Sequence, residues 1–251
     1  METQYEVIQA GEPKAPPRSL IRISGDRQLV ASLDAFGPNY FNSNVAKMQE
    51  QYSHPQTGDV ITFREPTTAE SIIVASYDFT NKAKPQILDP RLLQLGRIVR
   101  TSEGVFANVP RDAQGNPVTD EKILKSLLKA NKKVNGIYLL DKDIGYAPYG
   151  TFKQGVQDAG DFAESGLARV LEHSQSPKHL SGIASKRNYP RGVNVFGFDS
   201  VNQPVLKVAS LFSYRYSGIR QLGVDGDCWC DDDGGCAFGV LDSAEGTAKK
   251  I

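Results

Sequence analysis

The order of the elements predicted after residue 134 constrains the fold of this 251-residue chain more than any other feature. An apolar run at 136–140 predicts a strand, and apolar residues at helical spacing predict a helix over 161–173. A shorter helix is predicted around 180–184. Short strands follow, at 193–198, 205–211 and 237–241. This order predicts a mixed α+β fold for the C-terminal part, and we set its domain at 134–251.

The first 133 residues contain a proline-rich arm and a mixture of predicted strands and helices. Apolar spacing predicts a helix over 40–52, and a second helix capped by Thr119 follows the loop at 113–117. Strands are predicted at 5–8, 20–23, 60–63 and 72–79, and as a hairpin of 97–100 with 105–109. We expect 1–133 to be an N-terminal arm and mixed α/β region that serves oligomerisation or attachment.

Charge balance excludes several classes of function. The chain has 29 basic and 29 acidic side chains, so it is neither a basic nucleic-acid scaffold nor an acidic disordered segment. The C-terminal end of a predicted helix carries Lys129, Lys132 and Lys133, where the helix dipole favours basic side chains. These lysines are therefore explained by the helix end, and we expect no nucleic-acid partner. No apolar run approaches the roughly 18 residues that span a bilayer, so we expect no membrane insertion.

The first residues also lack the basic and apolar segments of a secretory signal. We therefore expect a location in a virus particle or the cytoplasm, or a cell-surface location reached by another route.

Recognisable catalytic motifs are missing from the sequence. The three histidines, His54, His173 and His179, are scattered, and His173 and His179 do not have the spacing of one helix face. The sequence contains no zinc-protease, nucleophile-elbow, Walker or dinucleotide-binding signature. We predict no enzyme activity, no catalytic residue and no cofactor.

The segment from Asp225 to Cys236 is unusual, because it holds five aspartates and all three cysteines of the chain. A calcium loop is one interpretation, although the EF-hand spacing and its closing glutamate are missing. Zinc or copper binding is a second, although Cys228 and Cys230 are one residue apart and a fourth ligand is missing. An exposed recognition loop is the third, and the single tryptophan, Trp229, favours it over a solvated acidic turn.

Residues 134–242 resemble the C-type lectin-like domain of variable proteins that are diversified by retroelements. That family includes phage receptor-binding tips and related archaeal viral or cellular proteins. The stretch from Lys207 to Arg220 resembles the opening of the family's variable region, with Ala209-Ser210-Leu211-Phe212 where the family has Gly-Gly-Ser-Trp. Residues 236–241 resemble its closing strand, and 192–199 resemble a turn and strand that formylglycine-generating enzymes share.

The resemblance has a consequence for residue types. In that family a reverse transcriptase miscopies template adenines, so that AAC codons become any NNC codon, which cannot encode Lys, Glu, Gln, Met or Trp. Between Phe212 and Cys236 only Gln221 and Trp229 belong to these types. The resemblance therefore implies a variable region over about 207–241 in which Gln221 and Trp229 are fixed scaffold, and it accounts for the cysteines without a metal or a disulfide.

The resemblance implies a non-enzymatic protein that binds a ligand or receptor through its variable surface. The expected binding residues are Ser213, Tyr214, Arg215, Tyr216, Ser217, Asp225, Asp227, Cys228, Cys230, Asp232, Asp233 and Cys236. Tyrosines would supply rigid contact area, and the aspartates would favour a protein or cell-surface ligand with a basic patch. Moderate affinity from such a surface would gain from several copies, so a homo-oligomer is possible.

Two alternatives stay open on the same fold. A thiol oxidase of the formylglycine-generating type would use Cys228 and Cys230 as a copper-binding pair. A calcium-dependent lectin would bind sugar through the acidic stretch from Asp225 to Asp233.

Overall fold

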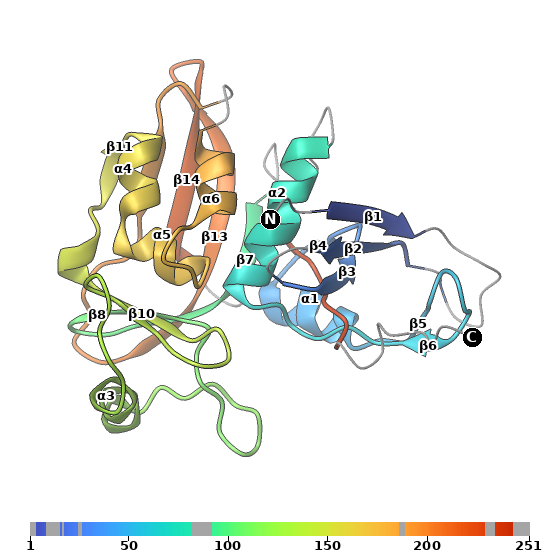
Figure 1. The fold of residues 1–251 in the computed structure, drawn as a ribbon, viewed down its shortest axis with the longest axis horizontal. Helices are drawn as coiled ribbons and strands as arrows, with labels where there is room; N and C mark the ends of the chain where they lie inside the picture. The colour runs from blue at the N-terminus through green and yellow to red at the C-terminus, as the bar shows by residue number, and fades with distance from the viewer. Residues whose placement is uncertain are drawn as a thin grey trace. The chain divides into compact units, whose positions relative to one another are not determined.

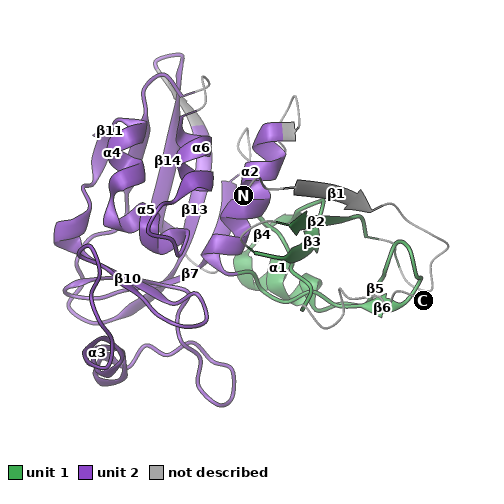
Figure 2. Cartoon of the chain, viewed as in Figure 1, with its two compact units in different colours: residues 1–66, 231–251 green, residues 67–230 purple. Residues whose placement is uncertain are grey.

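The computed structural model describes residues 4–8, 16, 18–24, 27–81, 92–185, 189–228 and 234–242. The chain is a mixed α+β protein, as the sequence predicts (Figure 1). It divides into two compact units (Figure 2). Unit 1 comprises residues 1–66 and 231–251, and unit 2 comprises residues 67–230.

Unit 1 joins the beginning of the chain to its end. Strands β1 (Gln4–Ile8), β2 (Leu20–Ser24) and β3 (Leu29–Ser32) form an antiparallel sheet. Strand β4 (Phe36–Asn39) pairs antiparallel with β15 (Gly235–Ala237). Val240 forms bridges with both Ala31 and Arg64.

The remaining elements of unit 1 surround a small aromatic core. Helix α1 (Phe41–Met48) is followed by the short strands β5 (Tyr52–Ser53) and β6 (Val60–Ile61). The rings of Phe36, Tyr52 and Phe63 meet edge to face with centroids 5.7–5.8 Å apart. The predicted helix over 40–52 therefore ends earlier, since Tyr52 is in a strand and its ring belongs to this cluster.

Unit 2 is built on one sheet with the strand order β11-β12-β14-β13-β7-β8-β10-β9. All neighbours are antiparallel except β12 and β14. The strands are β7 (Leu92–Arg100), β8 (Gly104–Ala107), β9 (Tyr138–Leu139), β10 (Gly145–Pro148), β11 (Gly155–Gln157), β12 (Val193–Phe196), β13 (Val205–Tyr216) and β14 (Ile219–Cys228). The predicted hairpin of 97–100 with 105–109 is present as β7 and β8, with Arg100 opposite Val105.

Helices of unit 2 pack onto this sheet and onto one another. They are α2 (Thr68–Asn81), α3 (Glu121–Lys129), α4 (Ala159–Glu164), α5 (Gly166–Leu171) and α6 (Lys178–Ala184), with a 3₁₀ turn at Tyr149–Thr151. Helix α2 packs against β7 and α6, and α5 packs against β8 and β10. Leu124 of α3 is buried in a cluster with Val99, Phe106 and Tyr146.

The boundary predicted between residues 133 and 134 falls inside unit 2. Strand β7, which precedes that boundary, pairs with β13, which follows it. The segment before residue 134 is therefore part of the same sheet as the predicted C-terminal domain. That pairing joins residues more than 100 positions apart, so local periodicity carries no trace of it.

The predicted strand at 72–79 is wrong, because these residues form helix α2. Thr67 and Glu70 form a reciprocal capping box: the Thr67 N–H donates to Glu70 Oε2 at 2.8 Å, and the Glu70 N–H donates to Thr67 Oγ1 at 3.2 Å. Residues 71–75 are all buried, and the Ser71 hydroxyl donates to the Leu95 carbonyl at 2.6 Å. A helix buried nearly all round shows no amphipathic period, so its apolar run resembles that of a buried strand.

Two other helices differ in detail from the prediction. The helix expected over 161–173 is broken at Ser165, which has extended backbone and whose Oγ accepts the Ala168 N–H. A Cβ at Gly166 would lie 2.2 Å from Thr151 Oγ1, so this glycine allows the second helix to pack closely. The helix assigned to a Thr119 cap begins one residue later, where Asp120 accepts the Lys122 and Ile123 N–H groups.

Removing the Thr67 hydroxyl is expected to destabilise unit 2. Thr67 Oγ1 accepts the Glu70 N–H and also donates to Asp143 Oδ2 at 3.1 Å. Thr67→Ala should lower the free energy of unfolding by about 1–2 kcal/mol in urea, because a helix cap and a second hydrogen bond are lost. Thr67→Ser should restore most of it. Thr80→Ala, in the exposed last turn of the same helix, is the control, and an equal loss there would contradict the capping role.

Candidate functional site

The hairpin of β13 and β14 contains much of the predicted variable region (Figure 1). Its two strands pair from Val208 opposite Cys228 to Tyr216 opposite Ile219. Ser217 and Gly218 form the turn with φ values of +50° and +79°. Two left-handed residues are the requirement of a type I′ turn, whose twist matches that of the strands. We call residues 213–219 the hairpin tip.

The opposite end of the hairpin is irregular on both sides of β13. We call residues 207–210 and 225–228 the hairpin base. Between the pairs Val208 with Cys228 and Ser210 with Asp225, β14 has one residue more than β13. Against β7, the register of β13 shifts between Ala209 and Ser210. Bulges of this kind turn side chains out of the regular alternation, and they are frequent beside functional sites.

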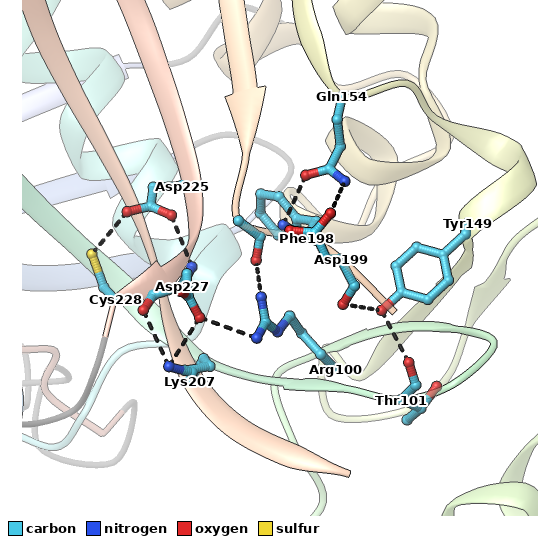
Figure 3. A network of polar contacts seen from close by, with 11 residues as sticks. Arg100, Thr101, Tyr149, Gln154, Phe198, Asp199, Lys207, Asp225, Asp227 and Cys228 are labelled. Atoms are coloured by element: carbon cyan, nitrogen blue, oxygen red, sulfur yellow. Dashed lines mark hydrogen bonds and ion pairs between the residues drawn. The ribbon is translucent and has the colours of Figure 1, made fainter. Parts of the chain in front are cut away.

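Two buried cations meet on one carboxylate at the hairpin base (Figure 3). Asp227 Oδ1 lies 2.9 Å from Lys207 Nζ and 3.1 Å from Arg100 Nη2. The Lys207 side chain is 2% exposed and the Arg100 side chain 10%, whereas that of Asp227 is 51% exposed. The two positive charges therefore belong to the interior, and the carboxylate between them is open to solvent.

Further contacts fix both cations. Arg100 Nη1 donates to the Gly197 carbonyl, and Lys207 Nζ donates to the Asp227 carbonyl at 3.3 Å. Within the part of the chain that the structure describes, Arg100 Nε is buried without a hydrogen-bond partner. The guanidinium thus keeps unused donor capacity in a place that water does not reach.

Asp225 has a different role from Asp227. Its Oδ1 accepts the Asp227 N–H at 2.8 Å, and its Oδ2 accepts the Cys228 thiol at 3.4 Å. Cys228 Sγ also lies 3.2 Å from Ser210 Oγ. A Cβ at Gly197, where φ is +75°, would lie 2.4 Å from Asp225 Oδ1, so a glycine is required for this approach. Asp225 therefore orders the bulge of β14.

A second set of contacts continues from Gly197 to the 3₁₀ turn (Figure 3). Gln154 Oε1 accepts the Phe198 N–H at 3.0 Å, and Gln154 Nε2 donates to Asp199 Oδ1 at 3.0 Å. The Tyr149 hydroxyl lies 3.0 Å from the carbonyl oxygens of both Thr101 and Asp199. Burial raises the pKa of Tyr149 to about 12, against the opposing effect of the Arg100 charge. Tyr149 thus stays a neutral donor that joins the turn after β12 to the end of β7.

Within the hairpin, the predicted binding residues that the structure describes fall into two groups. Residues 213–217 are at the tip, whereas Asp225, Asp227 and Cys228 are at the base. Along β13, Ser213 is three positions from Ser210, which pairs with Asp225, and Tyr216 is eight positions from Val208, which pairs with Cys228. The separations between the two groups are therefore roughly 10–27 Å in an extended strand. Cys228 is only 6% exposed and Cys236, in β15 of unit 1, only 1%.

Several predicted residues cannot be placed in this arrangement. Trp229, Cys230, Asp232 and Asp233 lie outside the described residues, as do the side chains of Tyr214, Arg215 and Tyr216. Ser217 is exposed at the turn. Gln221, predicted as fixed scaffold, is 3% exposed, and its amide donates to the Arg191 carbonyl at 3.1 Å.

Sequence reasoning assigned no role to Arg100, Lys207, Gln154 or Tyr149. A signal for Lys207 exists in the sequence, because it is a single charge within the apolar strand Val205–Leu211. A lysine at that position must either be exposed to solvent or be paired with a polar or charged group. No comparable signal reveals its partner, because pairing across the sheet brings Asp227 close to Lys207 and to Arg100.

Histidines contribute nothing to this network. His54, in unit 1, accepts the N–H groups of Gln56 and Thr57 at 3.3 Å each, and burial lowers its pKa. His173 Nε2 lies 2.8 Å from the Leu140 carbonyl, and its Nδ1 lies 3.5 Å from Asp143. Among the described residues, no group of three His, Cys, Asp or Glu side chains is arranged to hold a metal ion.

Comparison with known proteins gives no relative. No protein-family model, no curated protein and no solved structure matches this chain. In the described ranges, none of the helices has the length and apolar character needed to cross a bilayer.

The two partners of the Asp227–Lys207 ion pair are expected to respond unequally to substitution. Asp227→Asn removes the carboxylate and leaves two buried cations, so it should cost about 2 kcal/mol, less than the roughly 3–5 kcal/mol of a fully buried pair because Asp227 is half exposed. Lys207→Met keeps the volume and leaves Asp227 with Arg100 and water, so its cost should stay below about 1 kcal/mol. Urea unfolding measures both. Equal losses, or a larger loss for Lys207→Met, would contradict the assignment of the charges.

The raised pKa of Tyr149 predicts a loss of stability at high pH. The unfolded phenol ionises near 10.0 and the folded one near 12, so the folded state binds more protons between these values. The resulting stabilisation is complete below about pH 10 and is lost as the pH rises towards about 12. Unfolding midpoints of the wild type and of Tyr149→Phe should therefore converge over this interval. Parallel pH profiles would show that Tyr149 ionises alike in both states.

Proposed function

We propose that this chain is a non-enzymatic ligand-binding protein with a C-type lectin-like fold, whose C-terminal surface is diversified by a retroelement. The supporting observation is the hairpin of β13 and β14, which combines a buried, polar base with a tip that ends in an exposed turn. Such a hairpin is suited to presenting side chains that change while the fold persists. Exposed positions away from caps, cores and buried charges usually change stability by less than about 0.5 kcal/mol.

The segment that resembles the family's closing strand lies in unit 1, where β15 pairs with β4 and Val240 bridges Ala31. These partners precede residue 134, so they are not the first strand of the lectin-like domain proposed for the C-terminal part, and the proposal depends on the hairpin instead.

Residue types within the hairpin agree with diversification through NNC codons. Between Phe212 and Cys236, Gln221 is one of the two residues that those codons cannot encode. It is buried, and its amide donates a hydrogen bond to the carbonyl of Arg191, in the turn before β12. In the proposed function it would be invariant. The tip residues Ser213, Tyr214, Arg215, Tyr216 and Ser217 would vary and would supply the contact area.

The aspartates do not contribute equally to the charge preference of the proposed surface. Asp227 already faces Lys207 and Arg100, and Asp225 accepts hydrogen bonds from its own strand. A preference for a ligand with a basic patch therefore depends on Asp232 and Asp233 rather than on these two residues.

Neither alternative function gains support from the hairpin base. A copper-dependent thiol oxidase needs Cys228 accessible beside Cys230, but Cys228 is buried, and its thiol donates a hydrogen bond to the Asp225 carboxylate. A calcium site needs carboxylate oxygens that face an ion. Those of Asp225 face donors of the protein, and Oδ1 of Asp227 faces two cations. Ligand binding without catalysis is therefore the better proposal.

Diversification is tested on the encoding DNA. We expect a near-copy of the codons for residues 205–241 within a few kilobases of the gene, next to a reverse-transcriptase gene. The two copies should differ almost only where the template has adenine, and the codons of Gln221 and Trp229 should be unchanged. A flanking region without such a copy would refute diversification, and a copy with differences at all four bases would refute the mechanism.

A further inference from the structure

We propose that Arg100 and Lys207 form a receptor for one compact oxyanion, which the Asp227 carboxylate fills in this chain. Residue 227 would then determine whether the hairpin base is closed by the protein itself or open to an acidic group of an outside ligand. The proposal concerns a carboxylate or sulfate, the chemistry that acidic sugars and acidic side chains share. It rests on the proposed function only in treating residue 227 as variable.

Neither cation is expected to vary: Lys207 begins the predicted variable region, but NNC codons cannot encode lysine. Arg100 ends β7, outside the variable region, and is held by the Gly197 carbonyl. Lys207 is in β13, which pairs with β7 on one side and β14 on the other. Both side chains are at least nine-tenths buried, so neither can turn into solvent when its partner is replaced. The receptor would therefore persist in variants that lack Asp227.

Geometry limits the size of the anion. Both cations lie within about 3 Å of the same oxygen, Asp227 Oδ1. An oxygen held between an ammonium and a guanidinium carries a full or shared negative charge, as in carboxylates and sulfates.

Access to this position comes from the solvent side. The Asp227 side chain is 51% exposed although both of its partners are buried. Replacing it with a small residue would leave an opening of about the size of a carboxylate that leads to the two charges. Replacement of Asp227 removes the negative charge that both buried cations contact, so an anion that enters adds stability.

Residue 227 would thus couple ligand choice to stability. NNC codons include those for Asp, Ser and Gly. With Asp at position 227 the receptor is occupied, so the hairpin base does not bind an acidic ligand. With Ser or Gly, which leave the space of the carboxylate empty, the same base would bind an acidic group, and binding would restore the stability that the substitution removed.

Sulfate titration of two substituted proteins tests the proposal. Asp227→Ser and Asp227→Gly are unfolded thermally with increasing sodium sulfate at constant ionic strength, beside the wild type. We expect a saturable rise in melting temperature for both variants, equivalent to a roughly tenfold gain in the folding equilibrium constant at ten times the dissociation constant. The wild type should show only the gradual, non-saturating effect of sulfate as a kosmotropic salt.

A matched double variant identifies the binding residues. Asp227→Ser combined with Lys207→Met removes one of the two charges and should lose the saturable response while still folding. Acetate should act on the single variants as sulfate does, but more weakly. Variants that follow the wild-type curve, or that fail to fold at any sulfate concentration, would overturn the proposal, because outside anions would then not replace the carboxylate.

The result is independent of the test of diversification. If no template copy accompanies the gene, residue 227 is not variable, but a saturable sulfate response would still establish the receptor. If the copy exists and the response is missing, the chain is diversified without an anion site at the hairpin base.

Discussion

The position of Lys207 in the middle of a covered sheet determines much of what surrounds it. A lysine that is 2% exposed must have a counter-charge close by, and Asp227 supplies it from the neighbouring strand. The carboxylate reaches that position because β14 bulges between Asp225 and Cys228. The bulge is in turn ordered by the Asp225 carboxylate, and the glycine at 197 leaves room for it. One buried charge therefore accounts for an irregular strand, a required glycine and two distinct aspartate roles.

Sequence patterns predicted the parts of the fold that are decided locally. The hairpin of β7 and β8 follows from alternating apolar residues around Ser102-Glu103-Gly104, and helix α3 follows from its apolar spacing and acidic first turn. The Thr67 and Glu70 pair is an equally local signal for helix α2, but the apolar run that follows it is also typical of a buried strand. Because helix α2 is buried on nearly all sides, its sequence lacks the 3.6-residue apolar period that distinguishes a helix from a strand.

The candidate site was less predictable, because long-range pairing builds it. Asp225 and Asp227 are two residues apart and chemically identical, yet one accepts hydrogen bonds from its own strand while the other neutralises two buried cations. The partner of Asp227 on β7, Arg100, is 127 positions away in the sequence (227 − 100). The same limit explains why the boundary predicted at residue 134 falls inside unit 2, since β7 joins β13 across it. Composition identified the acidic segment that begins at Asp225, but the separate roles of Asp225 and Asp227 follow only from the register of the sheet.

Variation is not equally free along one hairpin. At the tip, Ser217 is exposed but is itself a left-handed turn residue with φ +50°, so Asn, Asp or Gly can replace it at lower cost than a β-branched residue. At the base, a change of Asp227 alters the balance of buried charge, which costs more than most surface substitutions. In the proposed function, variants of this chain would tolerate such a position in two ways: by keeping an acid there, or by taking the missing charge from the ligand. The second way would couple ligand binding to folding stability, and it would restrict the useful ligands of those variants to ones that carry an anion.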